Sequence, residues 1–188
     1  MARPIARGSV WVAAALGALI CVASASPRVG SAQVAAVPGT LAGTWMLDGE
    51  LSRAVHVVEA AFASSIARLP ELIQGFARDR IRSDMQPPRR VVVSLRDAGV
   101  RMTLESARTT VVDGSLGAPA AVSGIDSGTR VTPRLQSGWL ELRYEGEGSE
   151  LRQLFSTEAD ASRMHVDFTV TSPQLAAPVR YRLDYVHR

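Results

Sequence analysis

Hydrophobic and polar residues alternate with a period of two over most of the chain after Arg89. This period places successive side chains on opposite faces of a β-strand. Turn residues separate the alternating runs, and the connections are too short for crossovers between parallel strands. The pattern therefore predicts an antiparallel meander with strands at 90–96, 100–105, 107–112, 119–123, 128–136, 138–144, 150–156, 164–171 and 179–187.

A meander of this length has exposed edges unless it closes, so we expect a barrel. Pro133 has no amide hydrogen to donate to a strand ladder, which predicts an edge or bulged strand at 128–136. The dipeptide Asp113-Gly114 is typical of a hairpin turn and predicts one after 107–112.

The segment Leu41–Ser52 predicts a separate opening strand, well ahead of the meander. Asp48-Gly49 then supplies a turn, and Ser52 is expected to be the N-cap of a helix. The apolar face of this strand carries Leu41, Gly43, Trp45 and Leu47.

A helical period follows between residues 53 and 85, where apolar residues recur at steps of three and four. One continuous helix would be roughly 48 Å long, which exceeds a small domain. Pro70 predicts a break, because proline fits the first turn of a second helix. The predicted fold is therefore mainly β: an antiparallel up-and-down barrel of about 8–10 strands with a two-helix insertion after the first strand.

Residues 1–32 have the three parts of a secretory signal peptide: a basic start, a short apolar run and small residues at the cleavage site. We expect cleavage after Ala32, with Ala25 as the alternative and an uncleaved anchor as the less favoured interpretation. Ile20 is too bulky before Cys21 for a lipidation site. A flexible lead at 33–40 and one domain at 41–188, with helices at 53–85, would then form an exported protein, periplasmic or secreted.

Export changes the charge of the protein. Cleavage removes Arg3, Arg7 and Arg28 from the 21 basic residues and leaves 18, against 18 acidic ones, so the formal charge of +3 falls to zero. Nucleic-acid binding needs a surplus of clustered positive charge, and we therefore expect no nucleic-acid partner. Cys21, the single cysteine, leaves with the signal, so the mature chain would form no internal disulfide.

The Gly43-x-Trp45 motif on the opening strand, followed by many short strands, resembles the calycin group of lipocalin-like barrels. The run from Gly43 to Ser52 also resembles a broad set of exported bacterial lipocalin-like proteins of unassigned role. The resemblance implies a structural role for Trp45, with an arginine of the last strand lying over its indole ring, for which Arg182 is the favoured candidate. The sequence departs from the family because the helices follow the first strand rather than the last.

The alternation turns one face of each strand toward the barrel interior. A barrel of about eight strands is either just filled by side chains or holds one small ligand, and the sequence leaves both alternatives open. The favoured interpretation is a carrier of a small hydrophobic molecule; the alternative is a non-enzymatic envelope scaffold or protein-interaction module with a filled core. For the carrier, the expected ligand-contacting residues are Met102, Leu104, Leu142, Tyr144, Phe168, Tyr181 and Tyr185.

The predicted helices offer either a lid over the barrel or a basic surface for membranes and partners, with five arginines between residues 78 and 90. Glu71, Asp79 and Asp84 interleave with these arginines, which favours a solvated, salt-bridged face. The three histidines lack the spacing of a metal site, so we predict no metal, no cofactor and no catalytic residue. An enzyme is the third interpretation, and it would require polar groups gathered around His187.

Overall fold

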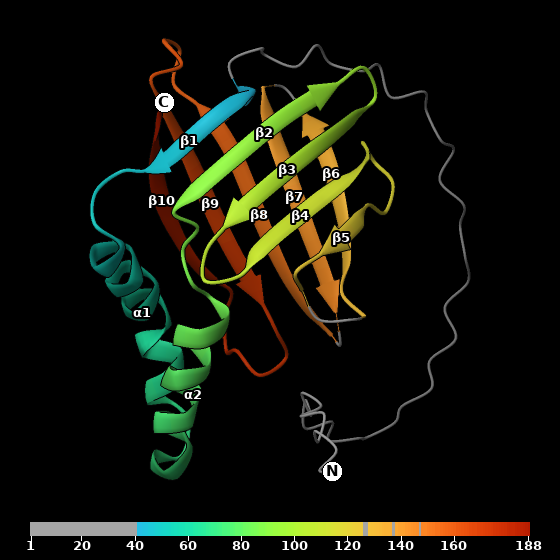
Figure 1. Cartoon of the computed structure of the whole chain (residues 1–188). Coiled ribbons are helices and arrows are strands. Elements are labelled where there is room, and N and C mark those ends of the chain that lie inside the picture. The colour runs from blue at the N-terminus through green and yellow to red at the C-terminus, as the bar shows by residue number, and fades with distance from the viewer. Residues whose placement is uncertain (1–40, 126–127, 137, 147) are drawn as a thin grey trace, which may run out of the picture. The chain divides into compact units, whose positions relative to one another are not determined.

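The computed structural model describes residues 41–125, 128–136, 138–146 and 148–188. Figure 1 shows ten strands and two helices in this part of the chain. The helices are α1 (Leu51–Ala67) and α2 (Glu71–Asp84), and both follow the first strand. The strands are β1 (Gly43–Leu47), β2 (Arg90–Arg96), β3 (Gly99–Glu105), β4 (Thr109–Ser115), β5 (Ala121–Ser123), β6 (Arg130–Gln136), β7 (Trp139–Gly146), β8 (Ser149–Thr157), β9 (Arg163–Thr171) and β10 (Val179–His187).

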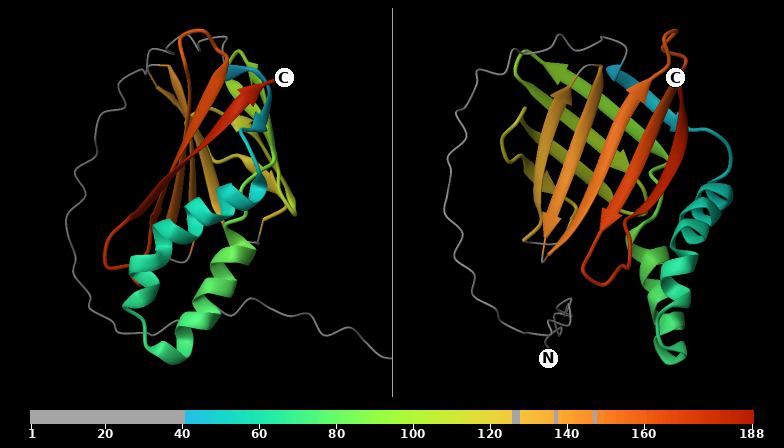
Figure 2. Two further views of the ribbon diagram at one scale, coloured as in Figure 1. Left: turned by 90° about the vertical axis from the view of Figure 1, so that its left-hand side faces the viewer. Right: turned by 180° about the vertical axis from the view of Figure 1, so that it is seen from behind.

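All ten strands belong to one antiparallel sheet in the order β5-β4-β3-β2-β1-β10-β9-β8-β7-β6. The sheet folds over so that β1–β5 face β6–β10 (Figure 2). Backbone bonds near its two ends close most of the gap: the Gly117 amide donates to the Pro133 carbonyl at 2.7 Å, and the Ala120 amide to the Val131 carbonyl at 2.8 Å. The predicted fold class, a mainly β antiparallel barrel with two helices after the first strand, is confirmed.

The strand alternation separates core from solvent as the sequence predicts. In β9, Met164, Val166 and Phe168 are buried, whereas Asp167 between them lies on the outer face and accepts two hydrogen bonds from Arg182 of β10, at 2.7 and 2.8 Å. Burial of such side chains contributes roughly 1.5–3 kcal/mol each and is the main stabilising term of the barrel.

Helix α1 packs on β10 through an apolar stripe. Val58, Phe62 and Ile66 recur at four-residue steps and form a cluster with Val179. Helix α2 packs on α1 through Ala77 and Ile81 but buries no residue completely. Figures 1 and 2 show the two helices side by side at one end of the barrel. Within the described part of the chain, neither helix has the length and apolar character required to cross a membrane.

The helix boundaries confirm one prediction and correct another. Pro70 separates the helices and occupies the N-cap position of α2. Ser52 is not the N-cap of α1, because the helix begins one residue earlier, at Leu51, with Glu50 in the cap position. Ser52 instead donates a hydrogen bond from its hydroxyl to the Glu50 carboxylate at 3.3 Å.

The predicted hairpin turn at Asp113-Gly114 is also wrong. Both residues lie inside β4, where Gly114 pairs with Val100 of β3. Gly114 is required for a close approach of the chain, since a Cβ there would lie 2.7 Å from the Ala120 side chain. The turn comes later, at Gly117, whose φ of 79° suits glycine.

Trp45 is fully buried, and its indole Nε1 donates to the Leu41 carbonyl at 3.0 Å. The expectation that Arg182 covers this ring is wrong, because residues of one strand alternate between faces. Arg182 lies on the outer face with Asp167, while His187, five residues later, meets the Trp45 ring edge to face.

Candidate ligand-binding site

A cavity of about 160 Å³ lies inside the barrel, beneath the linker that joins α2 to β2. Its walls come from both halves of the sheet, which is why the residues that meet there are far apart in the sequence. The described lining residues are Asp84, Met85, Gln86, Pro87, Pro88, Leu104, Ser106, Thr110, Ile125, Tyr144, Leu151, Gln153, Phe168, Tyr181 and Leu183.

Cross-strand register builds one wall. Gln153 of β8 pairs with Phe168 of β9, which pairs in turn with Tyr181 of β10, so the three side chains form a row on the inner face. The Phe168 and Tyr181 rings stack with centroids 4.6 Å apart and an interplanar angle of 9°. The row presents an aromatic surface that ends at a polar amide.

Two polar atoms in this wall lack a hydrogen-bond partner among the described residues: the Tyr144 hydroxyl and the Gln153 Oε1. Both side chains are more than nine-tenths buried, with 8% and 7% of their surface exposed. A buried polar atom without a partner costs about 1–3 kcal/mol, so native proteins rarely contain one without a reason. Because Tyr144 is the diagonal neighbour of Gln153 across β7 and β8, both unpartnered atoms belong to one part of the wall.

The linker above the cavity is fastened to the barrel. The Tyr185 hydroxyl donates to the Pro88 carbonyl at 3.0 Å, and the Leu47 amide donates to the Arg89 carbonyl at 3.0 Å. Pro87 and Pro88 are buried, which restricts the linker further. The ceiling of the cavity is therefore held in place on the β1–β10 side.

The cavity is electrically neutral apart from its rim. Among the described lining residues, Asp84 at the end of α2 is the one acidic or basic residue, and its carboxylate pairs with Arg80. Burial raises the pKa of the Tyr144 phenol and also that of the Tyr181 phenol, which is slightly less enclosed. Both hydroxyls are thus protonated at neutral pH and can donate or accept a hydrogen bond.

The structure brings together four of the predicted ligand-contacting residues: Leu104, Tyr144, Phe168 and Tyr181 line the cavity. The other three, Met102, Leu142 and Tyr185, are fully buried in the core and do not line it. That the lining residues bind a ligand stays a prediction.

Gln153 is the site residue that the sequence interpretation missed. It occupies an inward position between Leu151 and Phe155 on β8 and so breaks an apolar alternation. A polar residue at an inward strand position was the available signal. The linker residues 85–88 had no such signal, because their position above the cavity depends on tertiary contacts.

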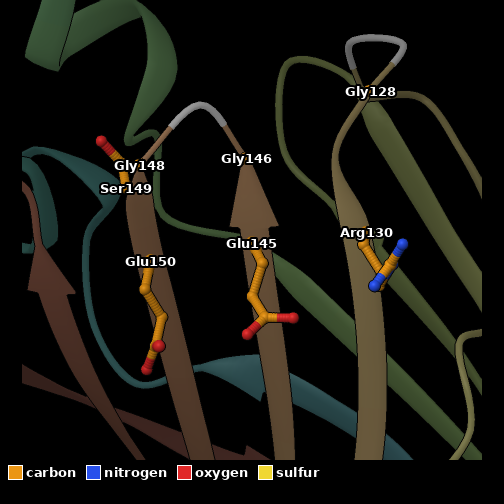
Figure 3. A pocket seen from close by; sticks show the side chains of 7 residues that line it. All are labelled: Gly128, Arg130, Glu145, Gly146, Gly148, Ser149 and Glu150. Carbon is orange, nitrogen blue, oxygen red and sulfur yellow. The ribbon is translucent and has the colours of Figure 1, made fainter. Parts of the chain in front are cut away.

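A larger concave region, about 440 Å³, lies between the turn that joins β7 to β8 and the start of β6 (Figure 3). We regard the smaller cavity as the candidate site because it is the more enclosed of the two. Its walls are turn glycines with Arg130, Glu145 and Glu150, and the two acids already form ion pairs with Arg143. Its described lining residues therefore include neither an apolar wall nor an unpaired buried group.

None of the three histidines is among the described residues that line the cavity. His165 lies outside the barrel between Asp184 and Glu158, and His187 contacts Trp45. No group of three His, Cys, Asp or Glu residues among the described positions has the geometry to hold a metal ion.

No protein-family model and no curated protein matches the sequence. Solved structures do match the fold. The fluorescent protein UnaG has a TM-score of 0.50 at 14% identity, covering 78% of this chain and 96% of its own. A structure described as REP1-NXSQ fatty acid transporter has a TM-score of 0.48 at 14% identity, with coverage of 79% and 96%. The expected calycin-type fold is confirmed at the level of architecture, because the chain shares its barrel fold with UnaG.

Proposed function

We propose that this protein binds and carries a small hydrophobic molecule in the cavity beneath the linker 85–88. The observation that carries the proposal is a mostly apolar cavity whose wall holds two buried polar atoms without partners among the described residues, Tyr144 Oη and Gln153 Oε1. In a scaffold with a filled core these two atoms would lower stability without any benefit, whereas a bound molecule can supply their hydrogen-bond partners.

The volume limits the ligand. A cavity of 160 Å³ is close to the roughly 150 Å³ of an engineered apolar cavity that holds benzene. Sites for drug-sized molecules measure about 300–1,000 Å³. A molecule of one ring therefore fits the cavity as it stands, and a larger one would require the linker and α2 to move.

We further propose that binding takes place outside the cytoplasm, in the periplasm or the extracellular medium. The basic start, short apolar run and small-residue sites of residues 1–32 support this location. The ligand would then be acquired or delivered beyond the inner membrane.

Ligand-observed NMR with toluene tests the proposed binding, because toluene has the size and apolar character of the cavity. Leu151 lines the cavity, so Leu151→Phe fills part of it and is expected to weaken toluene binding at least tenfold. Leu72→Phe is the matched control: Leu72 is 95% exposed on α2, and the same substitution there should leave the affinity unchanged.

Native mass spectrometry of protein purified from its own host completes the test. The expected result is a retained molecule of low mass. Failure of toluene to bind the wild-type protein, together with the absence of any retained molecule, would exclude the carrier and favour the alternative of a scaffold with a non-functional cavity.

A further inference from the structure

Building on the proposed function, we infer that the ligand is a neutral single-ring molecule with a hydroxyl or primary amide group, and not a carboxylate. The inference follows from the chemistry of the two unpartnered wall atoms and from the lack of a cationic side chain among the described residues of the lining. It specifies which polar group the apolar ligand carries and where that group lies.

The unpartnered atoms define the complementary group. Gln153 Oε1 is an acceptor and needs a donor, while the Tyr144 hydroxyl both donates and accepts. If the Gln153 amide is turned over, its NH₂ faces the cavity and needs an acceptor instead. Hydroxyl and primary amide groups satisfy either orientation because each contains a donor and an acceptor.

The geometry of the wall places this group. Gln153 and Tyr144 are diagonal neighbours on β7 and β8, and the stacked rings of Phe168 and Tyr181 continue the row from Gln153. A ligand ring lying against Phe168 and Tyr181 would thus carry its polar group at the Gln153 end. Such a molecule buries its apolar surface and places its polar group beside both side chains. Because the two orphaned atoms have almost no accessible surface, a rotation of the Gln153 amide and the Tyr144 ring brings them into contact with that group.

A carboxylate does not suit this wall. The described lining contains no arginine or histidine to neutralise it, and the acidic side chain at the rim, Asp84, is already paired with Arg80 of α2. Burying an ionised carboxylate without a cationic partner has a large desolvation cost. An amide of the same shape avoids that cost and keeps the hydrogen bonds.

Benzamide and benzoate test the inference, because they have nearly the same shape and differ in charge. At neutral pH we expect benzamide and benzyl alcohol to bind the mature protein at least tenfold more tightly than benzoate, as measured by ligand-observed NMR titration. Benzoate binding as tightly as benzamide would overturn the inference.

Two variants locate the polar contact. Gln153→Leu and Tyr144→Phe each remove one wall atom while keeping most of the side-chain volume, and each should weaken benzamide roughly tenfold. Toluene, which has no polar group, should bind these variants as tightly as it binds the wild type, or more tightly. An equal loss of toluene and benzamide in both variants would overturn the assignment of these atoms as ligand contacts.

The same titrations separate this inference from the proposed function. Toluene bound with benzoate preferred over benzamide would overturn the neutral-ligand inference and leave the carrier intact. Absence of binding by every probe would exclude the carrier itself, and the inference with it.

Discussion

The His187 imidazole meets the Trp45 indole edge to face, with ring centroids 4.9 Å apart and planes at 86°. The contact joins the first strand to the last, where Trp45 and His187 are register partners. Gly43 makes room for it, since a Cβ at that position would lie 2.6 Å from His187 Nε2. The Gly-x-Trp motif is therefore explained by this junction: glycine admits the imidazole and tryptophan forms the surface it covers.

His187→Ala is expected to lower the free energy of unfolding by about 1 kcal/mol, because aromatic pairs contribute roughly 0.5–1.5 kcal/mol beyond their area. Urea unfolding measures the change. His56→Ala is the control, since the His56 side chain is 79% exposed, and it should leave stability unchanged within error. An unaltered unfolding midpoint in His187→Ala would show that the junction does not depend on this ring contact.

The sequence predicted the strands and their antiparallel order because alternation and turn residues are local signals. It could not predict the partner of Trp45. Arg182 and His187 both lie on the last strand, and their roles depend on which face each occupies and on how β10 registers with β1. That register is set by the closure of the whole sheet, which no local pattern encodes.

Gly114 and Gly75 offer a matched test of close backbone approach. Gly114→Ala would place a Cβ 2.7 Å from Ala120, so we expect overpacking to cost about 1–3 kcal/mol. Gly75 lies in α2 with open space around it, and Gly75→Ala should be neutral or stabilise by up to about 1 kcal/mol through helix propensity. Thermal unfolding of the two variants compares the same chemical change in opposite settings, and equal effects would refute the role assigned to Gly114.

Because its three tyrosines are buried, we expect the protein to lose stability at alkaline pH. Burial raises the pKa of Tyr144, Tyr181 and Tyr185 above the ordinary value of about 10. Above that pH the unfolded chain releases phenolic protons that the native chain keeps, so the native state binds more protons and stability falls as pH rises. Each tyrosine contributes roughly 1.4 kcal/mol per pH unit to the slope.

Phenolate absorbance measures this titration directly. All three tyrosines of the chain are affected, so we expect no phenolate signal from the folded protein near pH 10 and a cooperative appearance of the signal on unfolding. Tyr144→Phe should reduce the slope of stability against pH by about a third. A signal that grows gradually while the protein stays folded would contradict the enclosure of these rings.

The candidate site shows the same limit of sequence interpretation as the Trp45 junction. Alternation correctly turned Met102, Leu142 and Tyr185 inward, but it does not reveal the depth of a residue along the barrel. Met102 and Leu142 lie in the filled part of the core, and the Tyr185 hydroxyl already donates its hydrogen bond to the Pro88 carbonyl. Periodicity therefore predicts which side chains of a strand point inward. The position of the cavity depends on where along the barrel the side chains stop filling the interior.

Helix α2 is expected to open independently of the barrel. It buries no residue completely, and Leu72 and Phe76 are 95% and 74% exposed, whereas α1 buries Val58, Phe62 and Ile66. The free energy of local opening rises with the number of buried apolar contacts, so a helix with few of them opens more readily. Hydrogen exchange should be faster in α2 than in α1 and slowest in β9; equal protection of α2 and β9 would contradict this order.

The amino terminus of the mature protein tests the predicted export. If residues 1–32 are a signal peptide, protein recovered from the periplasm or medium of its host should begin at Gln33, and intact mass together with amino-terminal sequencing will identify it. Cleavage at this site removes Cys21 and three arginines, so the secreted protein should fail to react with thiol reagents. It should also focus well below pH 9.7, the approximate isoelectric point of the 188-residue sequence. A start at Ser26 would move the cleavage site to Ala25 and leave export intact. Protein that retains Met1 and stays with the cytoplasmic fraction would refute export, and the ligand would then have to be sought among cytoplasmic metabolites.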